Sequence, residues 1–599
     1  MPDSRRVGVV VVTLNGGRLP VALYDDLIDV RVEQSVQLPD RFSLRFRDPD
    51  FDMLDAGTFS IGDSVDLAVD DGSAEVVVTH GEITSLAVDQ GEGGRHELIV
   101  AGLDRAHRLA RGPRVRTFLQ ATDAEVVRTI ASDHGLRADT DATPVVHPYL
   151  LQAQTDFAFL TERAMAAGFN WWVDDTTLYF KSRQSAGTGP KLVFGGNLLR
   201  FRLRCSAAES ASSVEVRAWD PERLQAIVGT ASTTSPGGPG VALASDAPIA
   251  TRQLQAASKS VAVGVKRGTG KIGVTSPKEA DDLAASIGRQ ATSEQVTAKG
   301  EVVGDPKLRA GTEVSVSGVG QQLSGSYVLT SVEHVVGTSR GYITRFHCAG
   351  RRPGGLVDLL GPRVVEPWVA TGPLIAIVTN TKDPERLGRV KVKYPTLSDS
   401  DESWWARVAS VGAGPARGFQ AGFEVGDEVL VAFEHGDLRR PIVLGGLWST
   451  KQKPPRNVGA VDESTGALVS QMWRSHDGHV VELHDSKTPG ESYVSVLHKD
   501  GKTKFRMGGD GVSIEAPTPV TITSDQGISV KAKGDLALEG LNVSITARAK
   551  VAVEGVSVAA KGKGQLQLEG AQAALKGSAM VSVEGGALAQ VKGAIVKLN

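Results

Sequence analysis

The residues best suited to metal chemistry form a short run of histidines and aspartates between His476 and Asp485. His476, His479 and His484 are separated by three and then five residues, and imidazole nitrogens are common zinc ligands. Association of several chains would multiply them. However, Asp477-Gly478 is a typical turn dipeptide, so the histidines are expected to flank a hairpin turn. The sequence therefore favours a turn over a metal site, and we predict no metal ligands.

Near the C-terminus, four glutamates recur at a spacing of fifteen residues, each followed by glycine. The pairs are Glu539-Gly540, Glu554-Gly555, Glu569-Gly570 and Glu584-Gly585. Such a series could form a catalytic or calcium-binding ladder. We favour outward corner residues that face the lysines Lys531, Lys550, Lys561 and Lys576, because exposed ion pairs of this kind are common and individually weak.

The remaining candidates for catalysis are scattered. Asp104 and His107, His134 and His334 belong to no nucleophile motif, and no Gly-x-Ser-x-Gly turn occurs between a strand and a helix. The adjacent Trp171 and Trp172 could mark a carbohydrate-binding surface, but large aromatics on a hairpin beside helices are more often core residues. We therefore predict no enzyme, no catalytic residue and no cofactor.

The glutamates belong to a repeat that covers residues 511–599. Alternating stretches such as Val543-Ser544-Ile545-Thr546 predict strands, and the regular glycines supply corners. After Phe505 there is no Phe, Tyr, Trp, His or Cys, so the interior must be narrow. Several intertwined copies of the chain would give such an interior and a needle of roughly 50 Å. The alternative is an ordinary single-chain β-helix.

Bulk properties set broad limits. The 599 residues are enough for several domains, and a net charge of −3 gives no overall attraction to nucleic acid. Cys205 and Cys348 have no metal-type spacing and are expected to be buried thiols in a reducing compartment. The first residues do not resemble a signal peptide. We expect synthesis in the cytoplasm, followed by assembly into a particle that stays there or is released.

Hydrophobic periodicity predicts a mainly β fold with small α insertions. Short alternating strands fill the first hundred residues. Helices follow at a Thr122–Glu125 capping box, at Asp156–Ala167 with its end at Gly168, and after an N-cap at Ser276. The predicted domains are a hub of two β-barrels with a helical insert (1–350), a linker (351–368), an OB-type barrel of about five strands (369–450), a second linker (451–470), a hairpin neck (471–510) and the β-helix needle (511–599).

OB barrels often bind oligonucleotides or sugars. Here Lys391 and Lys393 are surrounded by acidic residues, among them Asp399, Asp401 and Glu402. A basic groove with exposed aromatics is missing from the sequence pattern. We therefore predict no nucleic-acid partner.

The chain resembles the VgrG-like spike proteins of contractile injection systems. In the OB region the resemblance rests on Gly388–Val392, Trp405–Val408, Val425–Val431 and Gly436–Gly445. The first half is similar to the phage late-control hub domain at Phe42–Leu44, Gly102–Leu109, Gly304–Pro306 and Gly325–Tyr327. The terminal stretch Val591–Asn599 resembles the end of phage-type spikes.

The resemblance implies a non-enzymatic homotrimeric central spike whose C-terminal part is an intertwined triple-stranded β-helix. It implies as partners a tail tube protein, baseplate proteins, a PAAR-type tip protein docked at Lys597, Leu598 and Asn599, a possible cargo effector and the target cell envelope. Type VI tip proteins typically carry an aromatic-Trp-Asp-Arg stretch where this chain has Tyr394–Asp399. That departure favours a phage-tail-like particle over a type VI apparatus.

Three alternatives stay open. A type VI secretion tip protein or a bacteriophage tail spike would share the same domain order. A trimeric tailspike that degrades glycans would need clustered carboxylates and sugar-stacking aromatics on its β-helix. An oligonucleotide- or glycan-binding OB protein would need a suitable groove.

Overall fold

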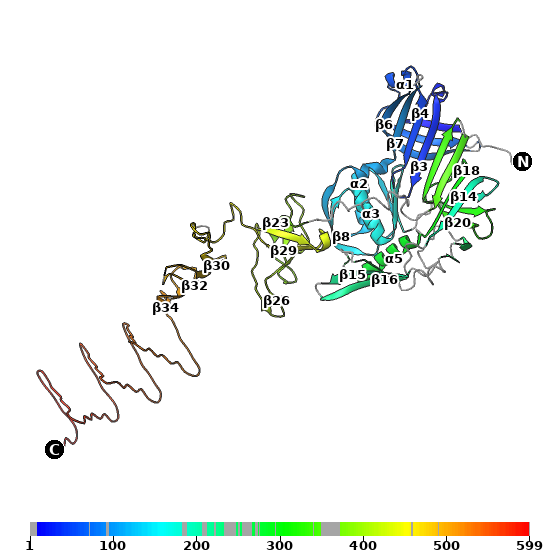
Figure 1. Cartoon of the computed structure of the whole chain (residues 1–599). Coiled ribbons are helices and arrows are strands. Elements are labelled where there is room, and N and C mark those ends of the chain that lie inside the picture. Colours follow the sequence, from blue (N-terminus) through cyan, green and yellow to red (C-terminus); the bar gives the residue numbers. More distant parts are fainter. Residues whose placement is uncertain are drawn as a thin grey trace. The chain divides into compact units, whose positions relative to one another are not determined.

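A computed structural model gives the fold of most of the chain (Figure 1). It describes residues 9–597 except 37, 71, 73, 92–94, 183–187, 207–211, 221–222, 233–246, 250–251, 254–265, 270–273, 275, 294, 339–340, 349–371, 457–458 and 489. The protein is mainly β with few helices, as predicted. None of the described helices is long and apolar enough to cross a bilayer. The chain divides into two units, residues 1–458 and 459–599.

The first unit is built around one eleven-stranded sheet. In spatial order its strands are β14 (Leu198–Cys205), β18 (Val296–Val303), β22 (Gly341–Cys348), β21 (Ser331–Gly337), β3 (Leu27–Ser35), β4 (Arg41–Arg47), β7 (Arg95–Leu103), β6 (Glu75–Gly91), β5 (Ser64–Asp70), β1 (Val9–Leu14) and β2 (Gly17–Arg18). The antiparallel pairing of β3 with β21 places Val32 opposite His334. The two barrels expected from the sequence therefore share a continuous sheet, each part with its own core.

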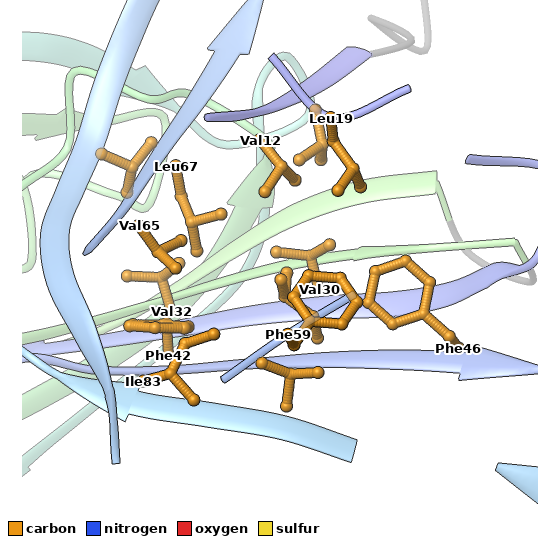
Figure 2. Packing of buried hydrophobic residues seen from close by; sticks show 14 of the residues in the cluster. Val12, Leu19, Val30, Val32, Phe42, Phe46, Phe59, Val65, Leu67 and Ile83 are labelled. Carbon is orange, nitrogen blue, oxygen red and sulfur yellow. The ribbon is translucent and has the colours of Figure 1, made fainter. Parts of the chain in front are cut away.

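The first core follows directly from strand alternation. Every second residue of β4 points inward, so Phe42, Leu44 and Phe46 are buried. Figure 2 shows Phe42 and Phe46 in one cluster with Val30 and Val32 of β3. A side chain at Gly102 of β7 would place its Cβ 2.2 Å from the ring of Phe42. Gly102 is therefore fixed by packing, because only glycine leaves room for that ring.

The helical insert packs as a separate core. Its helices are α2 (Asp123–Asp133) and α3 (Asp156–Ala167), and its strands are β8 (Arg114–Thr122), β9 (Arg137–Thr140), β10 (Val146–Gln154), β11 (Asn170–Asp174) and β12 (Thr177–Lys181). The predicted capping box is present: Thr122 and Glu125 each accept a hydrogen bond from the other's backbone. The predicted bounds of α3 and its left-handed Gly168 cap are confirmed.

Smaller elements complete the hub. They are η1 (Val21–Tyr24), α1 (Asp52–Asp55), η2 (Arg105–Ala110), the sheet of β13 (Thr188–Val193), β19 (Glu313–Ser317) and β20 (Gly325–Val328), and the sheet of β15 (Ser213–Asp220), β16 (Gln225–Ser232) and β17 (Lys266–Thr269). Helix α5 (Pro277–Ser293) covers the latter sheet and buries Ala280, Leu283 and Ala284 against it. The predicted N-cap, Ser276, accepts the backbone N–H of Glu279.

A five-stranded sheet forms the OB region, and all five predicted strands are present. The strands are β24 (Lys391–Lys393), β23 (Leu374–Asn380), β28 (Glu428–Phe433), β29 (Pro441–Gly446) and β25 (Arg407–Val408). A short hairpin, β26 (Ala413–Gly414) and β27 (Arg417–Gly418), and η3 (Glu434–Gly436) lie in its loops. The predicted linker 351–368 falls outside the described residues, so the proposed domain boundaries stay a prediction.

The second unit begins with an antiparallel meander of five strands, here called the neck sheet. Its strands are β30 (Ser470–Arg474), β31 (Val480–His484), β32 (Tyr493–Leu497), β33 (Lys504–Gly508) and β34 (Gly511–Glu515). Beyond Glu515 the described residues form no strand within the single chain. In Figure 1 they run as open, repeating turns without arrows. The reason is physical: an extended segment becomes a ladder only with a neighbouring strand.

A buried charge cluster holds the helical insert together. Arg163 of α3 donates to Asp123 at 2.6 Å, and His147 lies 3.4 Å from the same carboxylate. All three side chains are buried. Burial opposes ionisation, but the charge of Arg163 and the hydrogen bonds from His147 and Arg163 lower the pKa of Asp123 to about 2.

We predict that Asp123→Ala lowers the free energy of unfolding of the hub by about 3–5 kcal/mol, because it leaves Arg163 buried without its carboxylate. Urea denaturation followed by circular dichroism measures the change. The matched control is Asp282→Ala, which removes an exposed ion pair with Lys278 at 3.2 Å and should cost less than about 1 kcal/mol. Equal effects of the two variants would contradict the prediction.

Candidate functional site

The histidines near residue 480 lie on a hairpin, as the turn interpretation predicted. The backbone N–H of Gly478 donates to the backbone oxygen of Ser475 and closes the turn, and the rings of His479 and His498 pack edge to face with centroids 4.6 Å apart. His484 stacks on Tyr493 at 4.9 Å between ring centroids. Within the described ranges no group of three or more His, Cys, Asp or Glu side chains could hold a metal ion. The three predicted candidates are therefore not brought together as a ligand set in one chain.

The other histidines support local structure at separate places. His107 contacts the backbone oxygen of Asp104 at 2.6 Å, and His134 contacts the carboxylate of Asp156 at 2.8 Å. Burial lowers the pKa of His334 to about 4, and that ring contacts the hydroxyl of Tyr342 at 2.8 Å. These contacts lie in different parts of the hub, so the structure assembles no common site from them.

The tryptophan pair belongs mainly to the core of the helical insert. Trp171 is buried against Phe157, with ring centroids 4.9 Å apart, and its indole donates to Thr161. Trp172 stacks on Tyr179 with centroids 5.0 Å apart. The interpretation as core residues is confirmed for Trp171, whose faces are not free for a sugar.

The neck sheet has one apolar face that no described part of the single chain buries. Its register aligns two rows across all five strands that are apolar except for Gln471: Gln471, Leu483, Val494, Met507 and Val512, and Trp473, Val481, Val496, Phe505 and Ile514. Side chains of alternate residues share a face, so both rows lie on the same side. Most remain exposed, with Val512 at 68% and Ile514 at 61%. Contiguous exposed apolar surface of this kind marks an interaction site.

The opposite face of the neck sheet is polar, and many of its groups are paired within the chain. Ser470 donates to Glu482 at 2.8 Å, and Lys504 lies 3.0 Å from Glu515. The guanidinium of Arg506 stacks over Tyr493 at 4.8 Å and also binds Asp510. The sheet is therefore amphipathic, and only its apolar face lacks cover.

The repeat, like the apolar face of the neck sheet, leaves its apolar side chains exposed. Every described residue from 517 to 597 is exposed, including the apolar members that precede each glutamate, such as Val553 and Leu568. These residues also lack strand partners within the chain. Within the described single chain, neither the apolar side chains nor the backbone of the repeat is covered or paired.

The predicted corner residues lie at the surface. Glu539, Glu554, Glu569 and Glu584 are exposed, and none of them forms an ion pair within the described single chain. A Cβ at Gly585 would lie 2.5 Å from the backbone oxygen of Leu588, which fits a tight corner. Lys597 is exposed, whereas Leu598 and Asn599 lie outside the described residues.

A structural residue that the sequence analysis did not single out organises the OB loop at 380–389. Asp383 accepts backbone N–H groups from Glu385, Leu387 and Arg389, and it pairs with the guanidinium of Arg389 at 2.7 Å. Burial opposes its ionisation, but the hydrogen bonds from Arg389 and the backbone lower the pKa of Asp383 to about 2. The Asp383-Pro384 turn signal in the sequence could have indicated it.

Two family models match this chain, one over the hub and one over the OB region. A family described as the Alg8 N-terminal domain matches residues 31–338, which is more than half of the chain. The chain belongs to this family. A second match, to the type VI secretion system/phage-baseplate injector OB domain, covers residues 374–448. This member of the Alg8 N-terminal domain family therefore carries a baseplate OB domain where the sequence predicted one.

Curated relatives are similar over short stretches. The type VI secretion system spike protein VgrG1a of Pseudomonas aeruginosa is 33% identical over 136 residues, which is 21% of this chain and 21% of that protein. The spike protein VgrG3 of Vibrio cholerae is 37% identical over 92 residues, 14% of this chain and 9% of that protein. The chain thus spans about a fifth or less of the length of these relatives.

Among solved structures, a type VI secretion component of E. coli aligns with 15% identity and a TM-score of 0.44, covering 73% of this chain and 99% of that one. A chain of the Francisella PdpA-VgrG complex aligns with 8% identity and a TM-score of 0.48, covering 84% of this chain and 79% of that one. The predicted resemblance to VgrG-like spike proteins is confirmed by the OB-domain family and the curated relatives. These matches support a spike or tip protein of a phage-like secretion system.

We predict that Asp383→Ala loosens the OB loop, because it removes the common acceptor of three backbone N–H groups and the Arg389 side chain. Hydrogen–deuterium exchange in residues 380–389 should accelerate by roughly tenfold or more. The control is Asp399→Ala at an exposed position of the same domain, which should leave exchange in 380–389 unchanged. Unaltered exchange in Asp383→Ala would show that the carboxylate does not hold the loop.

Proposed function

We propose that the chain is the non-enzymatic, homotrimeric central spike of a phage-tail-like contractile injection system. In this role it links the tube and baseplate to the puncturing tip and pierces the target envelope. The observation that carries the proposal is the uncovered apolar face of the neck sheet, which continues into the exposed apolar repeat. Both features need further copies of the same chain.

In the proposed trimer, contacts between chains bury the apolar face of the neck sheet and the apolar side chains of the repeat. Three neck sheets can turn their apolar faces toward a common axis and leave their polar faces in water. Each fully buried Val, Leu or Ile side chain contributes roughly 1.5–3 kcal/mol relative to exposure. Beyond Glu515 the chains wind around each other, and strand pairing between chains satisfies the backbone that has no partner in one chain.

A needle built in this way is suited to mechanical work. Its core consists of small aliphatic side chains, and each strand is paired on both edges. Close packing and continuous ladders resist compression, as in other stacked β-structures. The proposed needle therefore transmits force from the contracting particle to the envelope. No catalytic residue, cofactor or metal is assigned to it.

The proposed partners follow from the family resemblance. The hub contacts the tube protein and the baseplate proteins. A PAAR-type tip protein caps the end near Lys597, Leu598 and Asn599, and cargo travels on a partner or in the tube. We propose synthesis in the cytoplasm and assembly into a particle that stays there or is released. No nucleic-acid partner is included.

A type VI secretion tip is the second candidate, and the curated relatives favour it because their names describe type VI spike proteins. The two candidates differ in where the assembled spike is found. Spike in sedimenting particles released into the medium supports the phage-tail-like system, and spike found only in cell-bound apparatus supports the type VI system. A glycan-degrading tailspike would instead require measurable glycan cleavage by the purified protein.

We predict that the purified chain is an elongated trimer. Size-exclusion chromatography with light scattering should give three times the chain mass of 63.0 kDa, with an elution volume smaller than that of a compact protein of equal mass. The control is a chain shortened to end before Gly511, which removes the repeat and should dissociate. A monomer of the full chain at micromolar concentration would overturn the proposal.

We also predict that a charge on the apolar neck face weakens the trimer, whereas the same charge on the other face does not. Val512 and Ser513 are neighbours in β34 on opposite faces, and Ser513 lies opposite Arg506. Val512→Glu should shift the trimer toward monomer at low micromolar concentration, since the carboxylate would be buried without a partner. Ser513→Glu should stay trimeric. Light scattering distinguishes them, and equal behaviour of both variants would place the trimer contact elsewhere.

A further inference from the structure

Two acidic residues in the hub, Asp40 and Asp104, are hydrogen-bonded to each other at a joint between strands. Asp40 precedes β4, and Asp104 follows β7 and caps η2. Asp104 accepts the backbone N–H of Asp40 at 3.0 Å, and the backbone N–H of Asp104 donates to the backbone oxygen of Asp40 at 2.9 Å. The second carboxylate oxygen of Asp104 accepts from Ala106 at 2.9 Å. The two residues thus lock the start of β4 to the start of η2.

The same joint connects three parts of the hub. The buried Gln34 of β3 donates to Asp40 at 3.1 Å and to the backbone oxygen of Val78 in β6 at 2.9 Å. Arg309, from the segment before β19, donates to the backbone oxygen of Val77 and lies 3.9 Å from Asp174 at the end of β11. The first barrel, the helical insert and the second half of the sheet therefore meet around Asp40 and Asp104.

No cation neutralises either carboxylate within hydrogen-bond or ion-pair distance among the described residues. The charged groups packed around them are engaged elsewhere: Arg309 with Asp174, Arg105 with Glu82 and Asp175, and Arg108 with Glu82. His107 of η2 directs one ring nitrogen to the backbone oxygen of Asp104 and the other toward Glu82 at 4.0 Å. Asp104 is buried and Asp40 is half-buried, and a carboxyl group removed from water without a counter-ion is favoured in its neutral form.

This environment raises the pKa of both carboxyl groups. Burial raises the pKa of Asp104 to about 7. Burial and the charge of Asp104 raise the pKa of Asp40 well above its usual value. The negative charge of Asp174 acts in the same sense on both pKa values. When two neighbouring acids interact in this way, they bind protons as a pair.

We propose that Asp40 and Asp104 form a proton-binding joint: the pair holds a proton at mildly acidic to neutral pH, and loss of that proton loosens the contact between the first barrel, η2 and the insert. The hub is thereby built to be tighter in mildly acidic surroundings than in alkaline ones. This device is independent of the subunit contacts at the neck and of any enzymatic role.

The direction of the effect follows from linkage. The folded joint binds the proton more tightly than the unfolded chain does, so its stability is greatest at low pH and falls as pH rises toward and through about 7. Burial lowers the pKa of His334 to about 4, which acts in the opposite direction between about pH 4 and 6.5 in another core. A local measurement is therefore needed.

The test uses the full chain. Hydrogen–deuterium exchange, corrected for intrinsic exchange rates, is measured in residues 34–42 and 100–108 between about pH 6 and 8.5. The wild-type protection factors should fall by about tenfold across this range, as expected for one linked proton. The double variant Asp40→Asn/Asp104→Asn should abolish most of that change, because it removes both carboxyl groups of the joint. Asp89→Asn, at an exposed position of β6, should retain the wild-type dependence.

Infrared difference spectroscopy of the wild type gives a second readout that needs no variant. The carbonyl band of a protonated carboxyl should be present at mildly acidic pH and should disappear with a midpoint near 7. Protection that does not depend on pH, a dependence kept in the double variant, or a missing band would each overturn the proposal. If the double variant does not fold, the wild-type infrared band alone decides.

Discussion

The chain depends on a simple constraint: a β-strand needs a hydrogen-bonded neighbour, and an apolar sheet face needs cover. The first unit meets both needs internally, since its sheets pair within the chain and its cores are closed. The second unit pairs the strands of its neck sheet within the chain but covers no apolar face among the described residues. The apolar face of the neck sheet and every described residue from 517 to 597 stay exposed. One chain thus combines a part that closes its own cores with a part that, in the proposed trimer, is completed by other copies of the chain.

This division has consequences for force transmission in the proposed spike. The hub resists distortion through its continuous eleven-stranded sheet, where β3 and β21 join the two halves, and through the buried Arg163–Asp123 contact in the insert. The needle resists distortion only through contacts between chains. In the needle, the same contacts between chains therefore provide both assembly and mechanical strength, whereas the hub is strengthened by contacts within one chain. A defect in a corner of the repeat would weaken both at once.

Local signals allowed much of the fold to be predicted. The capping box at Thr122, the glycine cap at Gly168 and the alternation in β4 each depend on neighbours within a few residues, so the sequence predicts them well. The shared sheet could not be predicted, because the pairing of Val32 with His334 depends on register between distant strands. The joint of Asp40 and Asp104 escaped notice for the same reason.

The candidate site, too, could be predicted from the sequence only in part. Alternation from Val480 to Ile514 could have revealed the apolar neck face, since the register of a meander is fixed by its short turns. The partner of that face could not be deduced from one chain, because identical strands offer many possible registers. Regular charges restrict that choice. In the proposed trimer, a slip of one residue would turn Glu539, Glu554, Glu569 and Glu584 into the aliphatic interior, where unpaired carboxylates are strongly disfavoured. Individually weak surface charges thus act together to exclude wrong registers, which explains their strict spacing without any catalytic or metal-binding role.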